Sequence, residues 1–195
     1  MIAFLNGHFA HKTASAVIID VNGVGYEVHI SLNTYSDIQH LEKGMLFTYY
    51  HVREDALTLY GFSKEDEKIL FINLISVSGV GAATARVMLS SMKPEEIIRA
   101  IATGNIRQLE SIKGIGKKSA ERIILELKDK LTKIGVGQTQ NNSTFKSNTL
   151  EQDALNALIS LGISRAAAEQ AVQRVITAEP GSQVEDIIKK ALKTM

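Results

Sequence analysis

A repeated glycine-edged segment in the middle of the chain constrains the fold more than any other feature. Residues 76–81 read Ser-Val-Ser-Gly-Val-Gly, and residues 111–116, which begin 35 residues later, read Ser-Ile-Lys-Gly-Ile-Gly. A similar pair of small residues follows each copy, Thr84-Ala85 in the first and Ser119-Ala120 in the second. Apolar residues at helical spacing lie on both sides of each copy, so each copy joins two helices. The pattern predicts two helix-hairpin-helix units in tandem.

The glycines in these segments favour a particular chemistry at the start of the following helix. A glycine on each side of one apolar residue lets the chain turn sharply and lets backbone N–H groups approach a ligand. The helix that follows begins with its own unpaired N–H groups and with the positive end of its dipole. We therefore expect two cradles for the phosphates of a nucleic-acid backbone, formed by Gly79, Val80 and Gly81 and by Gly114, Ile115 and Gly116.

A Gly-X-Gly triplet alone is weak support, because the same chain contains Gly-Val-Gly in other settings. It also occurs at residues 23–25, within a predicted β-turn, and at residues 135–137, in a polar segment. Only the copies at residues 79–81 and 114–116 have helical segments on both sides. For these two copies the alternative is a glycine-rich connection between packed helices. Their repetition at a fixed interval favours binding of a nucleic-acid backbone.

Basic side chains gather at the second cradle. Lys117 and Lys118 fall in the first turn of the following helix, where the helix dipole disfavours cations, so a bound anion would relieve a conflict. Arg122 lies further along the same side of the helix and Lys113 precedes the turn, so four cations surround this cradle. Ala82-Ala83 takes the place of the two lysines at the first cradle, which offers N–H groups and little charge. The alternative for the four cations is a solvated basic helix face.

The sequence lacks the residues for several kinds of catalysis. Residues 116–119 read Gly-Lys-Lys-Ser, but a nucleotide-binding P-loop needs a glycine at position 111, where this chain has serine, and Ser or Thr directly after the first lysine. The absence of cysteine excludes disulfides, thiolate metal sites and thiol catalysis. The five histidines, at positions 8, 11, 29, 40 and 51, match no metal-ligand spacing. We therefore expect no ATP hydrolysis, no cofactor and no metal site.

The first 62 residues have the alternating pattern of strands that are buried on one face. Residues 16–21 alternate, Asn22-Gly23 marks a turn, and residues 26–30 resume the alternation. Residues 46–52 and 56–62 predict a second hairpin with a charged tip. About five short strands in a segment of this length favour an OB-type β-barrel.

After the predicted barrel the pattern changes to helical spacing, which continues from residue 63 to residue 134. Ser63 and Asp66 resemble the start of a helix. Residues 135–149 are rich in Gly, Ser, Thr, Asn and Gln, so we expect a flexible linker there. Residues 150–195 carry three helical stripes of apolar residues and predict a small three-helix, UBA-like domain. The expected fold class of the whole chain is therefore α+β.

Charge is distributed unevenly over these parts. Residues 1–62 carry 3 basic and 6 acidic side chains, residues 63–134 carry 13 and 9, and residues 135–195 carry 6 and 6. The helical middle is therefore basic although the whole chain is nearly neutral. No apolar run approaches the roughly 18 residues of a membrane helix, and the N-terminus lacks the pattern of a signal peptide. We expect a cytoplasmic protein with no membrane partner.

The order of these parts resembles the RuvA family of bacterial proteins, which bind Holliday junctions. The resemblance covers the whole chain and is most specific at residues 52–62 (VREDALTLYGF), at residues 79–81 and at residues 114–130 (GIGKKSAERIILELKDK). It implies a homotetramer, alone or as two tetramers, that holds a four-way DNA junction open in a square plane. It also implies two protein partners, the hexameric ATPase RuvB, which moves the junction arms, and the nuclease RuvC. Such a protein acts in DNA recombination, DNA repair and the SOS response and is not itself an enzyme.

The resemblance also implies roles for residues outside the cradles. Glu54 and Asp55 stand at the position of an acidic pin between two barrel strands, where their charge would repel phosphates at the crossover. From the residues alone they form an ordinary charged turn, and a metal site would need further carboxylates. The C-terminal domain would bind RuvB through four apolar residues, some of which its own core also needs: Leu158, Leu161, Ile163 and Ile188.

Two rival functions stay open from the residues. A helix-hairpin-helix DNA repair enzyme, either a glycosylase-lyase or a nuclease, would need a catalytic lysine or aspartate beside the second hairpin, or a carboxylate cluster for a metal. Glu126 and Asp129 lie on the following helix without evident partners. A plain adaptor would use both hairpins only for packing. Ala82-Ala83 departs from the proline and basic residue that the family usually has there, which leaves the fold of the first hairpin unchanged and its share of the DNA affinity open.

Overall fold

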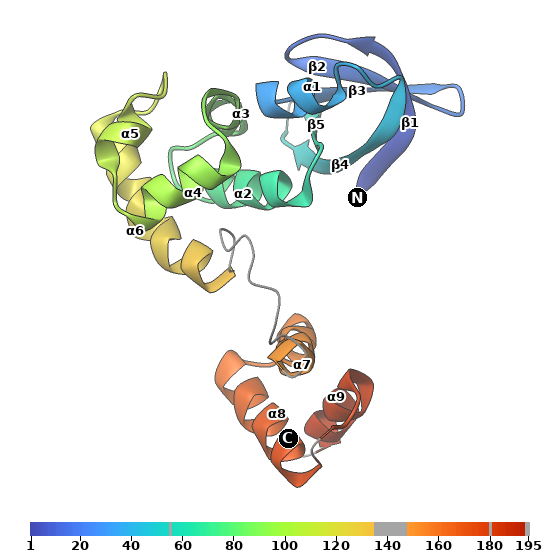
Figure 1. The fold of residues 1–195 in the computed structure, drawn as a ribbon, viewed down its shortest axis with the longest axis vertical. Coiled ribbons are helices and arrows are strands. Elements are labelled where there is room, and N and C mark those ends of the chain that lie inside the picture. The colour runs from blue at the N-terminus through green and yellow to red at the C-terminus, as the bar shows by residue number, and fades with distance from the viewer. Residues whose placement is uncertain (55, 135–147, 180, 194–195) are drawn as a thin grey trace. The chain divides into compact units, whose positions relative to one another are not determined.

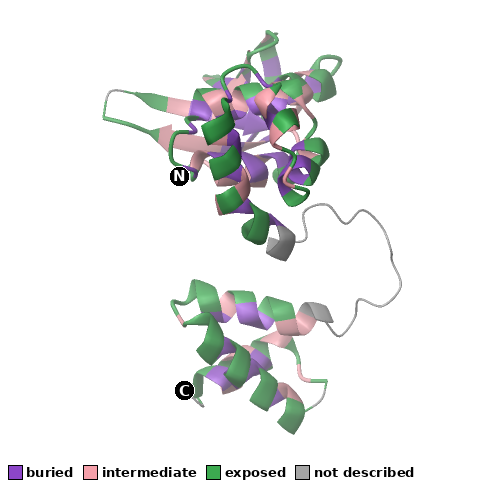
Figure 2. Ribbon diagram, turned by 90° about the vertical axis from the view of Figure 1, so that its left-hand side faces the viewer, coloured by how far each residue is buried: buried purple, intermediate pink, exposed green. Residues whose placement is uncertain are grey.

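The computed structural model describes residues 1–54, 56–134, 148–179 and 181–193 (Figure 1). These residues fall into two units. The first unit holds the described residues up to 134, and the second unit holds those from 148 onward. Among the described residues, the first unit has two buried cores, one in its strands and one in its helices, and the second unit has one (Figure 2).

The first part of the chain folds into a closed five-stranded barrel. Its strands are β1 (Phe4–Lys12), β2 (Ala16–Val21), β3 (Val24–Ile30), β4 (Lys43–Val52) and β5 (Leu57–Phe62), and the helix α1 (Leu32–Ile38) lies between β3 and β4. The strands pair in the order β1-β2-β3-β5-β4, and β4 pairs with β1 to close the barrel. Only β3 and β5 are parallel among these pairs. This topology confirms the predicted OB-type barrel.

A tight turn joins β2 to β3, as predicted. Asn22 and Gly23 both have positive φ angles, 53° and 87°, which is the backbone of a two-residue hairpin turn. The N–H of Gly23 donates to Oδ1 of Asp20 at 2.7 Å. Apolar side chains that face inward from the strands and α1 fill the barrel: Leu5, Phe9, Val17, Ile19, Val28, Ile30, Ile38, Leu46 and Leu59.

The described residues from 63 to 134 form two helical hairpins and the helix that connects them. The helices are α2 (Glu65–Ile75), α3 (Ala82–Ser91), α4 (Pro94–Ala102), α5 (Ile106–Glu110) and α6 (Lys117–Ile134). The first hairpin joins α2 to α3 and the second joins α5 to α6, which confirms the tandem helix-hairpin-helix arrangement. The helices share one core, whose largest side chains include Phe71, Leu74, Met88, Leu109 and Ile123.

The start of α2 differs from the prediction. Lys64, rather than Ser63, occupies the position before the first helical residue. The hydroxyl of Ser63 donates to Oδ2 of Asp37 on α1 at 2.6 Å. Ser63 therefore contacts α1 of the barrel segment, a long-range contact that a local capping pattern cannot reveal.

The second unit consists of α7 (Asn148–Ser160), α8 (Arg165–Ala178) and α9 (Val184–Lys193), as the prediction of a helical C-terminal domain requires. Residues 148 and 149 belong to α7 and not to the predicted linker, whose other residues, 135–147, lie outside the described part of the chain. The core of the unit combines all three helices. Within the residues that the structure describes, no helix has both the length and the apolar character that crossing a membrane requires.

Candidate nucleic-acid interface

The two helical hairpins repeat each other in their hydrogen bonds as well as in their sequence. The N–H of Val80 donates to the carbonyl of Val77 at 3.0 Å, and the N–H of Ile115 donates to the carbonyl of Ile112 at the same distance. One turn further on, the N–H of Ala85 donates to the carbonyl of Gly81. In the second copy the N–H of Ala120 donates to the carbonyl of Gly116, and both distances are 2.9 Å. Both turns therefore have the same backbone structure, as the sequence repeat predicts.

The glycines hold the turns in a backbone conformation that other residues rarely adopt. Gly79 has a φ of 88° and Gly114 a φ of 92°, which lie in the left-handed region that glycine enters without steric cost. A Cβ atom added at Gly79, Gly81, Gly114 or Gly116 would meet no atom within 4 Å. The glycine side of each turn therefore faces open space. Packing of the hairpins against each other does not cover these sides.

Two of the six predicted cradle residues have a different role from the one expected. The side chains of Val80 and Ile115 are buried, at 4% and 5% exposure, and their N–H groups donate within their own turns. Neither residue offers a group to a phosphate, and both instead anchor their turns to the helical core. The N–H groups that remain for an anion are those at the start of α3 and α6, because the first N–H groups of a helix have no partner within it.

Charge separates the two cradles. Lys113, Lys117 and Lys118 are all exposed around the second cradle. At the first cradle, Ala82 is buried at 2% exposure and Ala83 is exposed. The second cradle therefore combines backbone N–H groups with exposed cationic side chains, whereas Ala82 and Ala83 stand in the first cradle where the second has Lys117 and Lys118.

Arg122 connects the two hairpins. Its Nη1 donates to the carbonyl of Ser78 in the first hairpin at 3.3 Å, and its Nε lies 3.8 Å from the carboxylate of Glu126. The sequence predicted this arginine as a fourth cation of the second cradle. The structure places it between the two cradles, where it holds the loop of the first hairpin next to α6, the helix that follows the second cradle.

A buried carboxylate on α2, which was not among the residues predicted from the sequence, fixes the helical hairpins to the barrel. Glu67 is 2% exposed, and it accepts hydrogen bonds from the hydroxyls of Ser31 at 2.5 Å and Thr34 at 2.7 Å. Ser31 is also the N-cap of α1, where its Oγ accepts from the N–H of Thr34. Burial raises the pKa of Glu67 above its ordinary value, and each of the two hydrogen bonds lowers the pKa by a smaller amount. The only signal in the sequence is a carboxylate one turn before the apolar stripe of α2.

Further contacts dock the first hairpin on the barrel. Nη1 of Arg86, on α3, donates to the carbonyl of Ser15 at 3.2 Å and lies 3.1 Å from Nδ1 of His29. Nδ2 of Asn33, on α1, donates to the carbonyls of Leu89 at 2.6 Å and Met92 at 3.0 Å. The helix that begins at the first cradle, α3, is therefore held against the barrel by polar contacts at its middle and at its C-terminal end.

The predicted acidic pin lies on the β4–β5 hairpin. The N–H of Arg53 donates to the carbonyl of Ala56 at 2.9 Å and closes the turn. Glu54 is exposed in this turn, and Asp55 lies outside the described residues. Among the described residues, no group of three or more His, Cys, Asp or Glu side chains is arranged to hold a metal ion.

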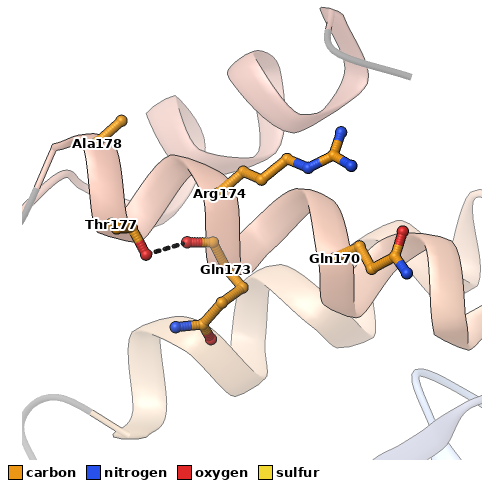
Figure 3. Close-up of a pocket in the computed structure, with 5 residues that line it drawn as sticks. All are labelled: Gln170, Gln173, Arg174, Thr177 and Ala178. Carbon is orange, nitrogen blue, oxygen red and sulfur yellow. Dashed lines mark hydrogen bonds between the residues drawn. The ribbon is translucent and has the colours of Figure 1, made fainter.

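The four residues predicted to contact a partner protein differ in exposure. Leu158 differs from the prediction: it is fully buried in the core of the second unit and is not exposed to a partner protein. Leu161 is 64% exposed, and Ile163 and Ile188 are half-buried. A groove elsewhere on this unit follows α8 and is lined by Gln170, Gln173, Arg174, Thr177 and Ala178 (Figure 3). None of the four predicted residues lines this groove.

An OB-type barrel followed by two helical hairpins with open glycine turns defines a protein of the helix-hairpin-helix class. Three family descriptions match the chain: "RuvA N terminal domain" at residues 1–61, "SAM-like Helix-hairpin-helix tandem" at 71–129 and "RuvA, C-terminal domain" at 149–195. The chain belongs to the RuvA family, as the resemblance in its sequence indicated.

Similar proteins match this chain along its whole length. The chain is 42% identical to a protein of Cytophaga hutchinsonii, with 99% of each chain covered. It is 45% identical to a protein of Flavobacterium psychrophilum and 41% identical to one of Bacteroides thetaiotaomicron, each with full coverage of both chains. All three relatives are named "Holliday junction branch migration complex subunit RuvA".

Proposed function

We propose that this chain binds four-way DNA junctions and takes part in branch migration as a subunit without catalytic activity of its own. The observation that carries the proposal is the pair of open glycine turns, which have one backbone structure and are joined by the hydrogen bond from Arg122 to Ser78. Two such turns side by side can hold two phosphates of a DNA backbone. The names of the relatives support this choice of ligand.

Contacts at the cradles reach the sugar-phosphate backbone, and three exposed lysines neutralise phosphates beside the second cradle: Lys113, Lys117 and Lys118. Binding through phosphates does not distinguish base sequences. It releases counterions from the DNA, so affinity falls steeply as salt is added. Recognition then depends on the shape of the junction, which a set of spaced phosphate sites can measure.

The acidic hairpin provides the second element of junction recognition. Glu54, with Asp55 beside it in the sequence, repels phosphates. At the centre of a crossover this repulsion keeps the strands apart, while the helical hairpins attract the arms. The proposed result is a junction held open in a square plane. A homotetramer, present once or as two facing tetramers, supplies four equivalent sets of contacts for four similar arms.

The second unit is proposed to bind the ATPase RuvB, which supplies the motor for branch migration. Leu161 is the best candidate for this contact because it is 64% exposed, with the half-buried Ile163 and Ile188 as further candidates. The nuclease RuvC is the other proposed partner. The proposal places the protein in the cytoplasm, in DNA recombination, DNA repair and the SOS response.

A gel-shift comparison tests the proposal. The full chain is titrated into a four-way junction and into a linear duplex of the same sequence, with and without magnesium. We expect the junction to be bound more tightly and to stay uncut. Equal affinity for the two DNAs would contradict the proposal. Cleavage in magnesium would favour the alternative of a repair enzyme built on the same hairpins.

A further inference from the structure

The β4–β5 hairpin extends past the barrel, and its apolar inner face extends with it. Successive side chains of a strand point to opposite faces, so Leu46, Tyr50 and Val52 share one face of β4. Val52 pairs with Leu57 and Tyr50 pairs with Leu59 across the hairpin. Leu46 and Leu59 are buried in the barrel, whereas Val52 is 62% and Leu57 66% exposed. The face that fills the barrel thus ends in an exposed cross-strand pair, Val52 and Leu57, which we call the apolar pair.

The surroundings of the apolar pair differ from those of an ordinary exposed turn. Figure 2 shows the hairpin reaching away from the rest of its unit, with exposed residues toward its end. Arg53 follows Val52 directly, and its Nε donates to Nε2 of His51 on the opposite face at 2.9 Å. Glu54 is exposed next to it. An apolar surface, a cation and an anion therefore lie within a few residues at the end of the hairpin.

We infer that the apolar pair contacts unpaired nucleobases where DNA strands separate around the hairpin. The inference rests on the proposed function. Aliphatic side chains of DNA-binding proteins insert against base faces and unstack them, and the flat face of one base matches the size of two such side chains. Arg53 can neutralise the phosphate of the same nucleotide, and Glu54 repels the phosphates further along.

A second copy of the chain is a poorer occupant for this surface. Two side chains form an area far below the roughly 800 Å² that each partner buries in a stable protein interface. If two copies packed through their apolar pairs, the Glu54 side chains of both hairpins would also come together, and like charges in such positions destabilise a contact. The size and charge of the surface therefore favour a base.

The experiment uses a four-way junction with 2-aminopurine at the crossover, because this base becomes more fluorescent when it is unstacked. The full-length V52T/L57N variant replaces both apolar side chains with polar ones of similar size. With the wild-type chain we expect the fluorescence to rise on binding. With the variant we expect less than about half of this rise, and a junction affinity roughly 3- to 10-fold lower because two apolar contacts are lost.

Val24 provides a matched control, because it is 54% exposed on another hairpin of the same barrel. The V24T variant should give the wild-type fluorescence. The single variants V52T and L57N, with circular dichroism as a check of folding, should each give an intermediate rise.

An equal rise with V52T/L57N and wild type, or no rise with wild type bound to the junction, would overturn the inference. A smaller oligomer for V52T/L57N in light scattering would also overturn it, because the pair would then be a subunit contact. Failure of the wild type to prefer the junction would contradict the proposed function itself.

Discussion

The two helical hairpins have the same backbone structure but differ in what surrounds them: one contacts the barrel and the other carries exposed charge. Their turns have matching hydrogen bonds and matching left-handed glycines. The first hairpin leads into a helix whose Arg86 contacts the barrel, whereas the second leads into a helix whose Lys117 and Lys118 are exposed. Different residues therefore set the backbone shape and the charge. The glycines build the same turn twice, and the side chains anchor one copy to the barrel and charge the other.

Of the substitutions considered, Glu67→Ala should have the largest effect, because it removes the buried contact that anchors the helical hairpins to the barrel. The change leaves the buried hydroxyls of Ser31 and Thr34 without their acceptor. We expect the free energy of unfolding to fall by about 2–4 kcal/mol, since each unsatisfied buried group costs about 1–3 kcal/mol. Tyrosine fluorescence during urea unfolding of the full chain measures it, because all five tyrosines lie between residues 26 and 60. Glu65→Ala, an exposed position on the same helix, should cost less than about 0.5 kcal/mol, and equal losses for both variants would refute the anchoring role.

The double substitution K117A/K118A removes two of the positive charges at the second cradle. Loss of two phosphate contacts should weaken junction binding by roughly 10- to 100-fold and reduce the slope of log affinity against log salt by about 2. Unfolding should be unchanged or slightly harder, because cations at a helix N-terminus are disfavoured. Gel shifts at several salt concentrations check this. The control variant K189A/K193A removes two exposed lysines from the second unit and should bind like wild type; an unchanged salt slope in K117A/K118A would show that these lysines do not meet DNA.

The shared backbone is tested by alanine at the glycines. At Gly79 and Gly114 the positive φ makes alanine strained, so G79A and G114A should each lower the free energy of unfolding by a similar amount, about 1–2 kcal/mol. Gly116 does not have this φ, so G116A should leave stability near wild type and weaken junction binding by placing a methyl group in the cradle. Thermal unfolding and gel shifts separate the two effects. Stability losses that differ greatly between G79A and G114A would contradict the equivalence of the two turns.

The difference in charge between the hairpins can also be reduced. Ala83 is exposed at the first cradle and corresponds to Lys118 of the second. One added phosphate contact in Ala83→Lys should strengthen junction binding by roughly 3- to 10-fold at low salt. Ala82→Lys adds the same charge at a buried position and should destabilise the fold instead. If Ala83→Lys bound no better than wild type in a salt titration, the first hairpin would have no phosphate within reach.

Glu67 should also make the free energy of unfolding depend weakly on pH. Because burial raises the pKa of Glu67 above its ordinary value of 4.5, the native state binds more protons than the unfolded state as pH rises from that value through the raised one. The stability of the wild type therefore falls over this window, and Glu67→Gln, which cannot ionise, lacks the fall. The stability of Glu67→Gln relative to wild type should increase from pH 4.5 to neutral pH. A constant difference in urea unfolding would contradict the raised pKa.

The sequence predicted the parts that depend on local patterns. Alternation over residues 16–30 gave the first hairpin of the barrel, and the repeat at residues 76–81 and 111–116 gave both helical hairpins and the positions of their glycines. Each of these features is encoded within a few neighbouring residues. Turn geometry and strand pairing across a tight turn depend on that local range.

The parts that the sequence did not predict depend on residues far apart in the chain. Glu67 meets Ser31 across 36 residues, and Arg122 meets Ser78 across 44, so no local spacing marks either contact. Leu158 was mispredicted for a different reason. An apolar residue at helical spacing fits a buried core and a contact surface equally well. Only the packing of α7 against its neighbours shows that Leu158 belongs to the core.

The proposed function requires that backbone N–H groups at the two glycine turns hold the sugar-phosphate chain. NMR of the deuterated full chain, labelled with ¹⁵N at its 14 glycines, measures this directly when the junction is added. We expect large shifts of the amide signals of Gly81 and Gly116. The signals of Gly23 and Gly25 in the barrel turn should stay unchanged and serve as an internal control. Junction binding that leaves the signals of Gly81 and Gly116 in place would contradict it.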